Sequence, residues 1–210
     1  GVDVPARRIV ITAGASAALQ LACLALIESG DEILMPDPSY PCNRHFVSAA
    51  EGNAVLIPTT AQERFQLSAA KVEAAWTPRT RGVLLASPSN PTGTSIHPAE
   101  MARIHSFVSG KGGITLLDEI YLGLSHDDAF GQTALALDDQ LISINSFSKY
   151  FNMTGWRLGR WWSAWRKTCS SAPAPLRSMR RWPVLRLRAS LNTNAAARSS
   201  RPGATGSSPR

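Results

Sequence analysis

The chain has 210 residues, 44% of them hydrophobic, and a formal net charge of +7 at pH 7. This composition suits a globular core and argues against a membrane protein, because no stretch reaches the ~18 apolar residues of a membrane span and we recognise no signal peptide. The three cysteines lack the spacing of a zinc site or a disulfide framework, so we predict no metal and a reducing, cytoplasmic location.

The charge is divided unevenly along the chain. Residues 1–159 carry 11 Lys and Arg against 15 Asp and Glu, a net charge of −4, whereas residues 160–210 carry 11 basic and no acidic residues. Neither helical nor strand periodicity persists in this second part. A basic segment can bind nucleic acid or a membrane surface, or it can be disordered. We favour a third interpretation, in which residues 160–210 are a basic low-complexity tail translated out of frame.

Short β-rich runs alternate with helical stretches along residues 1–150. The predicted strands, bounded by Gly, Pro, Asp or Ser, are 9–12, 32–35, 54–57, 83–86, 114–117 and 141–145. The predicted helices are 16–28, 40–50, 68–75 and 98–109. This alternation indicates an α/β fold with a mostly parallel sheet, whose ligands usually bind at the carboxyl ends of the strands.

Two turns in the first third of the chain could bind an anion and an aromatic ring. After the first strand, Gly14, Ala15 and Ser16 open an apolar helix. Its free backbone N–H groups and the Ser16 hydroxyl could hold a phosphate. Tyr40 lies in a proline-rich turn after the next strand, from which it could stack on a pyridine ring. A serine N-cap and an ordinary turn would explain the same residues.

Two further motifs follow strands in the middle of the chain. Asn90 lies in the sequence Ser-Pro-Ser-Asn-Pro-Thr-Gly, where the prolines would fix the direction of its amide. The alternative for this segment is a structural turn. Asp118 and Tyr121 come at the end of a later strand. A carboxylate there could face a protonated ring nitrogen, or hold Mg²⁺ as in nucleotide hydrolases. The Mg²⁺ alternative is disfavoured because no Gly-rich loop with Lys-Ser/Thr accompanies it.

The segment 146–159 places one lysine among hydroxyls, aromatics and an arginine. Ser146 and Ser148 precede Lys149, and Arg157 follows it. A lysine amine can form a Schiff base with the aldehyde of pyridoxal phosphate, and serine and arginine are residue types that hold its phosphate. The alternative is a Ser/Lys turn that closes a strand.

Together these motifs resemble those of the class I/II pyridoxal-phosphate-dependent aminotransferases, the aspartate aminotransferase family. The family's order and similar spacing are kept by Asn90, Asp118, Tyr121, Lys149 and Arg157. The resemblance covers about residues 5–159. It implies fold type I of the pyridoxal phosphate enzymes, a three-layer α/β/α arrangement, with residues 1–159 as a partial large domain. It also implies a homodimer with active sites at the subunit boundary.

The resemblance implies a role for each predicted site residue. Lys149 would anchor pyridoxal phosphate and act as the general base that removes the Cα proton of the substrate. Asp118 would face the ring nitrogen, and Tyr40 would stack on the ring. Asn90 and Tyr121 would bind its 3′ oxygen. The phosphate ligands would be Ala15, Ser16, Ser146, Ser148 and Arg157.

The implied reaction transfers an amino group between an amino acid and a 2-oxo acid. No residue matches the family's amino-terminal arm or its substrate-carboxylate arginine, and we expect the final strand of the large domain, after Gly159, to be lost. The chain would then be a truncated fragment. Two alternatives remain: a pyridoxal phosphate lyase or synthase of the same fold, and a pyridoxal-phosphate-binding regulatory module whose basic tail contacts nucleic acid. The regulatory module is disfavoured because no helix-turn-helix pattern is visible.

Overall fold

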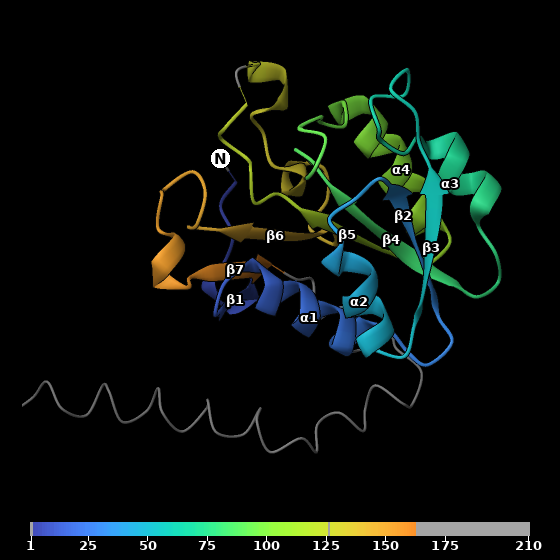
Figure 1. Ribbon diagram of the computed structural model, residues 1–210, viewed down its shortest axis with the longest axis horizontal. Coiled ribbons are helices and arrows are strands. Elements are labelled where there is room, and N and C mark those ends of the chain that lie inside the picture. The colour runs from blue at the N-terminus through green and yellow to red at the C-terminus, as the bar shows by residue number, and fades with distance from the viewer. Residues whose placement is uncertain (1, 126, 163–210) are drawn as a thin grey trace, which may run out of the picture. The chain divides into compact units, whose positions relative to one another are not determined.

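A computed structural model describes residues 2–125 and 127–162 of the chain. In this part of the chain the strands form one seven-stranded sheet, in the order β1-β7-β6-β5-β4-β2-β3 (Figure 1). The strands are β1 (Ile9–Thr12), β2 (Glu32–Asp37), β3 (Asn53–Pro58), β4 (Thr80–Ala86), β5 (Ile114–Asp118), β6 (Ile142–Ser146) and β7 (Gly159–Trp162). The predicted tail lies outside the described residues from residue 163 on.

Every predicted strand and helix is present, with its ends within three residues of the predicted ones. The helices are α1 (Ala15–Leu26), α2 (Cys42–Ala49), α3 (Ala69–Ala75) and α4 (Pro98–Gly110). The short 3-10 helices in the described residues are Ala6–Arg8, Asp128–Phe130, Ala134–Ala136 and Thr154–Trp156.

Local sequence signals set where the helices begin. The Ser68 hydroxyl caps α3 by accepting a hydrogen bond from the Lys71 backbone N–H at 3.3 Å. Helix α4 starts with Pro98, whose missing N–H costs nothing in a first turn. The N-cap of α1 is Gly14 with φ 92°, a conformation that favours glycine. Ser16 therefore lies inside the first turn of α1 and is not its N-cap.

The sheet is mostly parallel, as the alternation of elements predicts. Strands β3, β2, β4, β5 and β6 are parallel neighbours, whereas β7 is antiparallel to both β6 and β1. We expected the final strand after Gly159 to be lost. This expectation is wrong, because residues 159–162 form β7. The backbone of residues 159–162 fills the space between β1 and β6, so it satisfies the hydrogen-bonding edges of both strands.

Helices cover both faces of the sheet, which gives the three-layer α/β/α arrangement (Figure 1). Alternate residues of the central strands point to opposite faces. Leu84 and Leu116 pack in the core beneath α1 and α2, whereas Leu85 and Leu117 pack in the core beneath α3 and α4. Both cores are built almost entirely from Leu, Ile, Val and Ala, as expected for strands that are buried on both faces.

Candidate active site

The predicted site residues follow strands whose carboxyl ends meet at one edge of the sheet. Strands β4, β5 and β6 are parallel neighbours, so their last residues lie side by side. Asp118 is the last residue of β5, Asn90 lies in the loop after β4, and Lys149 follows the end of β6. This edge is where an α/β sheet usually binds its ligand.

Strand β7 brings the start of α1 to the same edge. Gly159 is the register partner of both Thr12, at the end of β1, and Ser146, at the end of β6. A Cβ atom built on Gly159 would lie 2.5 Å from the carbonyl carbon of Gly14 and 2.7 Å from the backbone nitrogen of Ala15. The first turn of α1 therefore lies directly against β7.

The hydroxyls of Ser146 and Ser148 form a buried pair. The Ser146 hydroxyl donates to Oγ of Ser148 at 2.8 Å, and it accepts a hydrogen bond from the Ser148 backbone N–H at 3.0 Å. The Ser146 hydroxyl also lies 3.2 Å from the carbonyl oxygen of Leu158, so two acceptors share its single proton.

The guanidinium of Arg157 lies beside the first turn of α1. Its Nη2 is 3.4 Å from the carbonyl oxygen of Ala13, and its Nη1 is 3.3 Å from that of Thr154. Arg157 has a left-handed backbone conformation, with φ 51° and ψ 45°. The guanidinium charge and the helix amino terminus both favour an anion. We call the set of Ala15, Ser16, Ser146, Ser148 and Arg157 the anion cradle.

Asp118 is buried at the end of β5, on the same face as Leu116. The pKa of its carboxyl is raised from 3.8 to about 6, chiefly by burial and to a smaller extent by the neighbouring Glu119. A hydrogen bond from the Ile120 backbone N–H to Oδ1, 3.0 Å long, opposes this rise. The carboxylate is therefore poised to gain stabilisation from a cationic partner.

Glu119 was not among the predicted site residues, yet it is the most completely hydrogen-bonded carboxylate at this edge. Its carboxylate accepts from the Thr133 hydroxyl at 2.6 Å, from the Ala134 backbone N–H at 2.8 Å and from the Ser143 hydroxyl. Burial raises its pKa, and these hydrogen bonds oppose the rise. Its role is to anchor the segment before β6. Strand alternation predicts that Glu119 lies on the opposite face of the sheet from Asp118. It does not predict which residues donate hydrogen bonds to the Glu119 carboxylate.

Lys149 and Tyr121 come together above the edge. Nζ of Lys149 lies 5.6 Å from the centre of the Tyr121 ring, which is a cation–π distance. Lys149 is exposed and Tyr121 is half-buried. The amine is therefore held near an aromatic face and is open to solvent.

Tyr40 lies between Ser16 and Cys42. A hydrogen bond with the Cys42 thiol raises the pKa of the Tyr40 hydroxyl, burial adds to the rise, and a hydrogen bond with Ser16 opposes it. The neighbouring Tyr121 also contributes to the raised pKa. These contacts join Tyr40 to the anion cradle on one side and to Tyr121 on the other. Cys42 was not among the predicted site residues.

Asn90 lies in a loop that is shaped by prolines. The Ser87–Pro88 and Asn90–Pro91 peptide bonds are both cis. Asn90 is half-buried, and among the described residues its side chain forms no hydrogen bond. Contacts thus link Tyr40 to Ser16 and to Tyr121, and Tyr121 to Lys149. In the part of the chain that the structure describes, no side-chain hydrogen bond joins Asn90 or Asp118 to this group.

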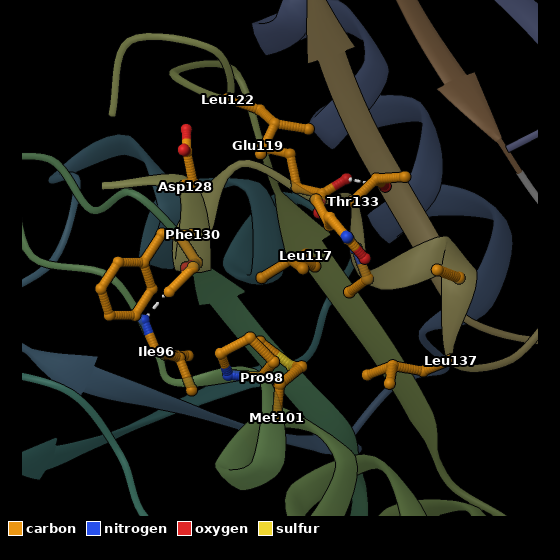
Figure 2. A pocket seen from close by; sticks show the side chains of 15 residues that line it. Ile96, Pro98, Met101, Leu117, Glu119, Leu122, Asp128, Phe130, Thr133 and Leu137 are labelled. Atoms are coloured by element: carbon orange, nitrogen blue, oxygen red, sulfur yellow. Dashed lines mark hydrogen bonds between the residues drawn. The ribbon is translucent and has the colours of Figure 1, made fainter. Parts of the chain in front are cut away.

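A cavity of about 240 Å³ lies on the other face of the same edge (Figure 2). Its walls are Ile96, the start of α4 with Met101, the end of β5 with Leu117, and the segment that contains Phe130 and Leu137. The lining includes none of the predicted site residues. Within the described ranges, no helix is long and apolar enough to cross a membrane, and no three His, Cys, Asp or Glu side chains gather around a metal position.

The layered sheet with a lysine and a buried aspartate at its carboxyl edge defines an α/β domain of the class that binds ligands at that edge. The sequence pattern of the family described as aminotransferase class I and II matches residues 2–169. The chain therefore belongs to the class I and II aminotransferases, a pyridoxal-phosphate-dependent family. The match continues beyond residue 159, where we expected the resemblance to end.

Curated relatives and solved structures of this family are similar to the chain. It is 44% identical over 161 residues to a valine–pyruvate aminotransferase of Mycobacterium tuberculosis, covering 76% of this chain and 41% of that protein. It is 32% identical over 158 residues to an aspartate aminotransferase of Pyrococcus abyssi, covering 74% of this chain and 41% of that protein.

The crystal structure of an aminotransferase from Mycobacterium tuberculosis matches with a TM-score of 0.72 at 43% identity, covering 77% of this chain and 42% of that one. The aspartate aminotransferase from Thermotoga maritima matches with a TM-score of 0.73 at 30% identity, covering 77% of this chain and 44% of that one. The chain thus spans about two fifths of the length of these relatives.

Proposed function

We propose that the chain carries the pyridoxal-phosphate-binding part of an aminotransferase, which moves an amino group between an amino acid and a 2-oxo acid. The observation that carries the proposal is that an anion cradle adjoins Lys149 at the carboxyl edge of the sheet. Family membership supports it, because the relatives bear the names of valine–pyruvate and aspartate aminotransferases.

The anion cradle fits the phosphate of pyridoxal phosphate by its chemistry. Helix N–H groups, serine hydroxyls and a guanidinium are all hydrogen-bond donors, and no carboxylate belongs to the set. Gly14 leaves room for the guanidinium beside the first turn of α1, since a Cβ atom there would lie 2.3 Å from Nη2 of Arg157. The buried Asp118 offers the opposite charge, which suits a protonated ring nitrogen.

Each protein group would have one task. When bound, pyridoxal phosphate would supply an aldehyde and a ring that withdraws electrons from the amino-acid Cα. The Lys149 amine would accept the Cα proton and hold it for return. Asp118, as a carboxylate, would keep the ring nitrogen protonated, and Tyr40 would stack on the ring. Tyr121 and Asn90 would donate hydrogen bonds to the 3′ oxygen.

We further propose that the whole protein is a cytoplasmic homodimer, with amino acids and 2-oxo acids as its small-molecule partners. Support for the dimer comes from exposed aromatic side chains around Lys149: Tyr150 and Phe151 are each 55% exposed and Trp156 is 70% exposed. Aromatic surface of this kind is typical of protein interfaces. In the same proposal, residues 1–162, which include β7, belong to the large domain, and the basic tail follows them.

The test is a covalent map of the cofactor. The full chain is mixed with pyridoxal phosphate and reduced with borohydride, and its peptides are analysed by mass spectrometry. We expect the label on Lys149, with no label at this position after Lys149→Ala and an unchanged label after Lys111→Ala. A label scattered over Lys71 and Lys111 would contradict the proposal. With amino-acid panels, 2-oxo acid formation separates an aminotransferase from a lyase of the same fold.

A further inference from the structure

Gly14 and the guanidinium of Arg157 occupy adjoining space. A Cβ atom built on Gly14 would lie 2.3 Å from Nη2 and 3.0 Å from Cζ of Arg157. Both atoms belong to the far end of a flexible side chain. An alanine at position 14 would therefore displace the guanidinium from the start of α1, while the backbone of the turn could remain where it is. The φ of 92° adds backbone strain to the same substitution.

Gly159 meets a rigid neighbour instead. A Cβ atom built on Gly159 would lie 2.5 Å from the carbonyl carbon of Gly14, 2.8 Å from its oxygen and 2.7 Å from the Ala15 backbone nitrogen. These are backbone atoms, so they could move only with the whole turn between β1 and α1. Because Gly159 is also the register partner of Ser146, it fixes the distance between the two halves of the anion cradle.

Two other glycines provide matched comparisons. Gly30 has φ 87°, close to that of Gly14, and Gly155 lies two residues before Arg157, as Gly159 lies two residues after it. A Cβ atom on either one would meet no atom within 4 Å. The close approaches at Gly14 and Gly159 therefore do not follow from glycine backbone geometry alone.

We propose that Gly14 and Gly159 are positioning residues of the anion cradle. Gly14 leaves the space that the Arg157 guanidinium needs beside the first turn of α1, and Gly159 holds that turn against the end of β6. The inference rests on the proposed function and deepens it, since it identifies the backbone contacts that set the geometry of the phosphate site.

The experiment compares two ligands that differ only in the phosphate group. Binding of pyridoxal phosphate and of pyridoxal to the full chain is measured by absorbance titration for the unsubstituted protein, Gly14→Ala and Gly30→Ala. We expect Gly14→Ala to weaken pyridoxal phosphate binding by at least about tenfold, or about 1.4 kcal/mol, and to leave pyridoxal binding unchanged. Gly30→Ala carries similar backbone strain and should change neither affinity. Thermal unfolding of both variants checks that the fold is kept.

A second substitution tests whether Gly14 acts on pyridoxal phosphate binding through the guanidinium of Arg157. In an Arg157→Ala background there is no guanidinium to displace, so Gly14→Ala should weaken pyridoxal phosphate binding less than about twofold. An equal loss in both backgrounds would overturn the role of Gly14. For Gly159→Ala, we expect a loss of pyridoxal phosphate affinity that Gly155→Ala does not share, and equal affinities for these two variants would overturn the role of Gly159.

The proposed function and this inference fail in different ways. If the unsubstituted chain gives no borohydride-stable label on Lys149, the proposed function is wrong and this inference falls with it. If the label forms and Gly14→Ala still binds pyridoxal phosphate within about twofold of the unsubstituted chain, a difference of about 0.4 kcal/mol, only the role of Gly14 is wrong.

Discussion

The Nζ atom of Lys149 lies 5.6 Å from the centre of the Tyr121 ring. The two side chains come from loops after neighbouring parallel strands, β6 and β5, so strand pairing alone brings them close. An aromatic face attracts an ammonium group through the ring quadrupole. Tyr121 can therefore hold the amine in place through its ring and offer a hydrogen bond through its hydroxyl, and the two contributions are separable.

The first prediction separates the ring of Tyr121 from its hydroxyl. Tyr121→Phe should weaken pyridoxal phosphate binding by about 1 kcal/mol, because one hydrogen bond is lost. Tyr121→Leu should cost about 0.5–1 kcal/mol more, because the cation–π contact with Lys149 is lost as well. Titration of both variants measures the difference. Identical affinities for Phe and Leu would show that the ring does not act on Lys149.

The second prediction concerns the pH dependence of stability that Asp118 causes. Its pKa is about 6 in the folded chain, against 3.8 for the ordinary group. Between these two pH values the folded state binds the proton and the unfolded state has released it, so the free energy of unfolding falls as pH rises. The loss is on the order of 3 kcal/mol and is complete above the folded pKa.

Asp118→Asn should remove this dependence. We expect the variant to be more stable than the unsubstituted chain at pH 7, less pH-dependent between pH 4 and 6, and impaired in pyridoxal phosphate binding, since the neutral amide cannot pair with a protonated ring nitrogen. Urea unfolding at several pH values measures the first two effects. A variant that is less stable at neutral pH would show that Asp118 is not an uncompensated buried charge.

The third prediction concerns Glu119, which accepts hydrogen bonds from Thr133, Ala134 and Ser143. Glu119→Gln replaces one acceptor oxygen by an NH₂ donor that faces other donors. We expect the free energy of unfolding to fall by about 1–3 kcal/mol. The exposed Glu73→Gln is the control and should change it by less than about 0.5 kcal/mol. Equal stability of the two variants would mean that the segment before β6 is held by other contacts.

The fourth prediction concerns Tyr40. Its hydroxyl is engaged with Cys42 and Ser16, so the part that remains for a cofactor is the face of the ring. Tyr40→Phe keeps that face and releases Ser16, and it should change pyridoxal phosphate affinity by less than about threefold. Tyr40→Leu removes the ring and should weaken binding by about 1–2 kcal/mol. A larger loss with Phe than with Leu would assign the role to the hydroxyl.

The secondary structure could be predicted from the sequence because its signals are local. The runs of Val, Ile and Leu between Gly and Pro set the strands, and Ser68 and Pro98 set two helix starts. Parallel strand order then places Asp118 and Lys149 at one edge, as expected. Those inferences need only neighbouring residues and the rule for parallel sheets.

The geometry of the site needed contacts between distant segments. Nothing near Gly159 in the sequence indicates that it pairs with both Thr12 and Ser146, and the expected loss of a strand after it was an error of the same origin. The partners of Glu119 likewise lie up to 24 residues away. The close approach of Gly14 to Arg157 depends on side-chain packing across 143 positions of the chain, which no local pattern encodes.

The place of β7 between β1 and β6 has a consequence for synthesis on the ribosome. Strands β1 and β6, together with Ser146 and Ser148, are translated before β7, the strand that lies between them. Pairings that span most of a chain form late, because the loop between them must first be closed. A nascent chain that ends before residue 159 therefore holds Lys149 but lacks the strand that joins the two halves of the anion cradle. Under the proposed function, cofactor binding would mark the moment at which β7 closes the sheet.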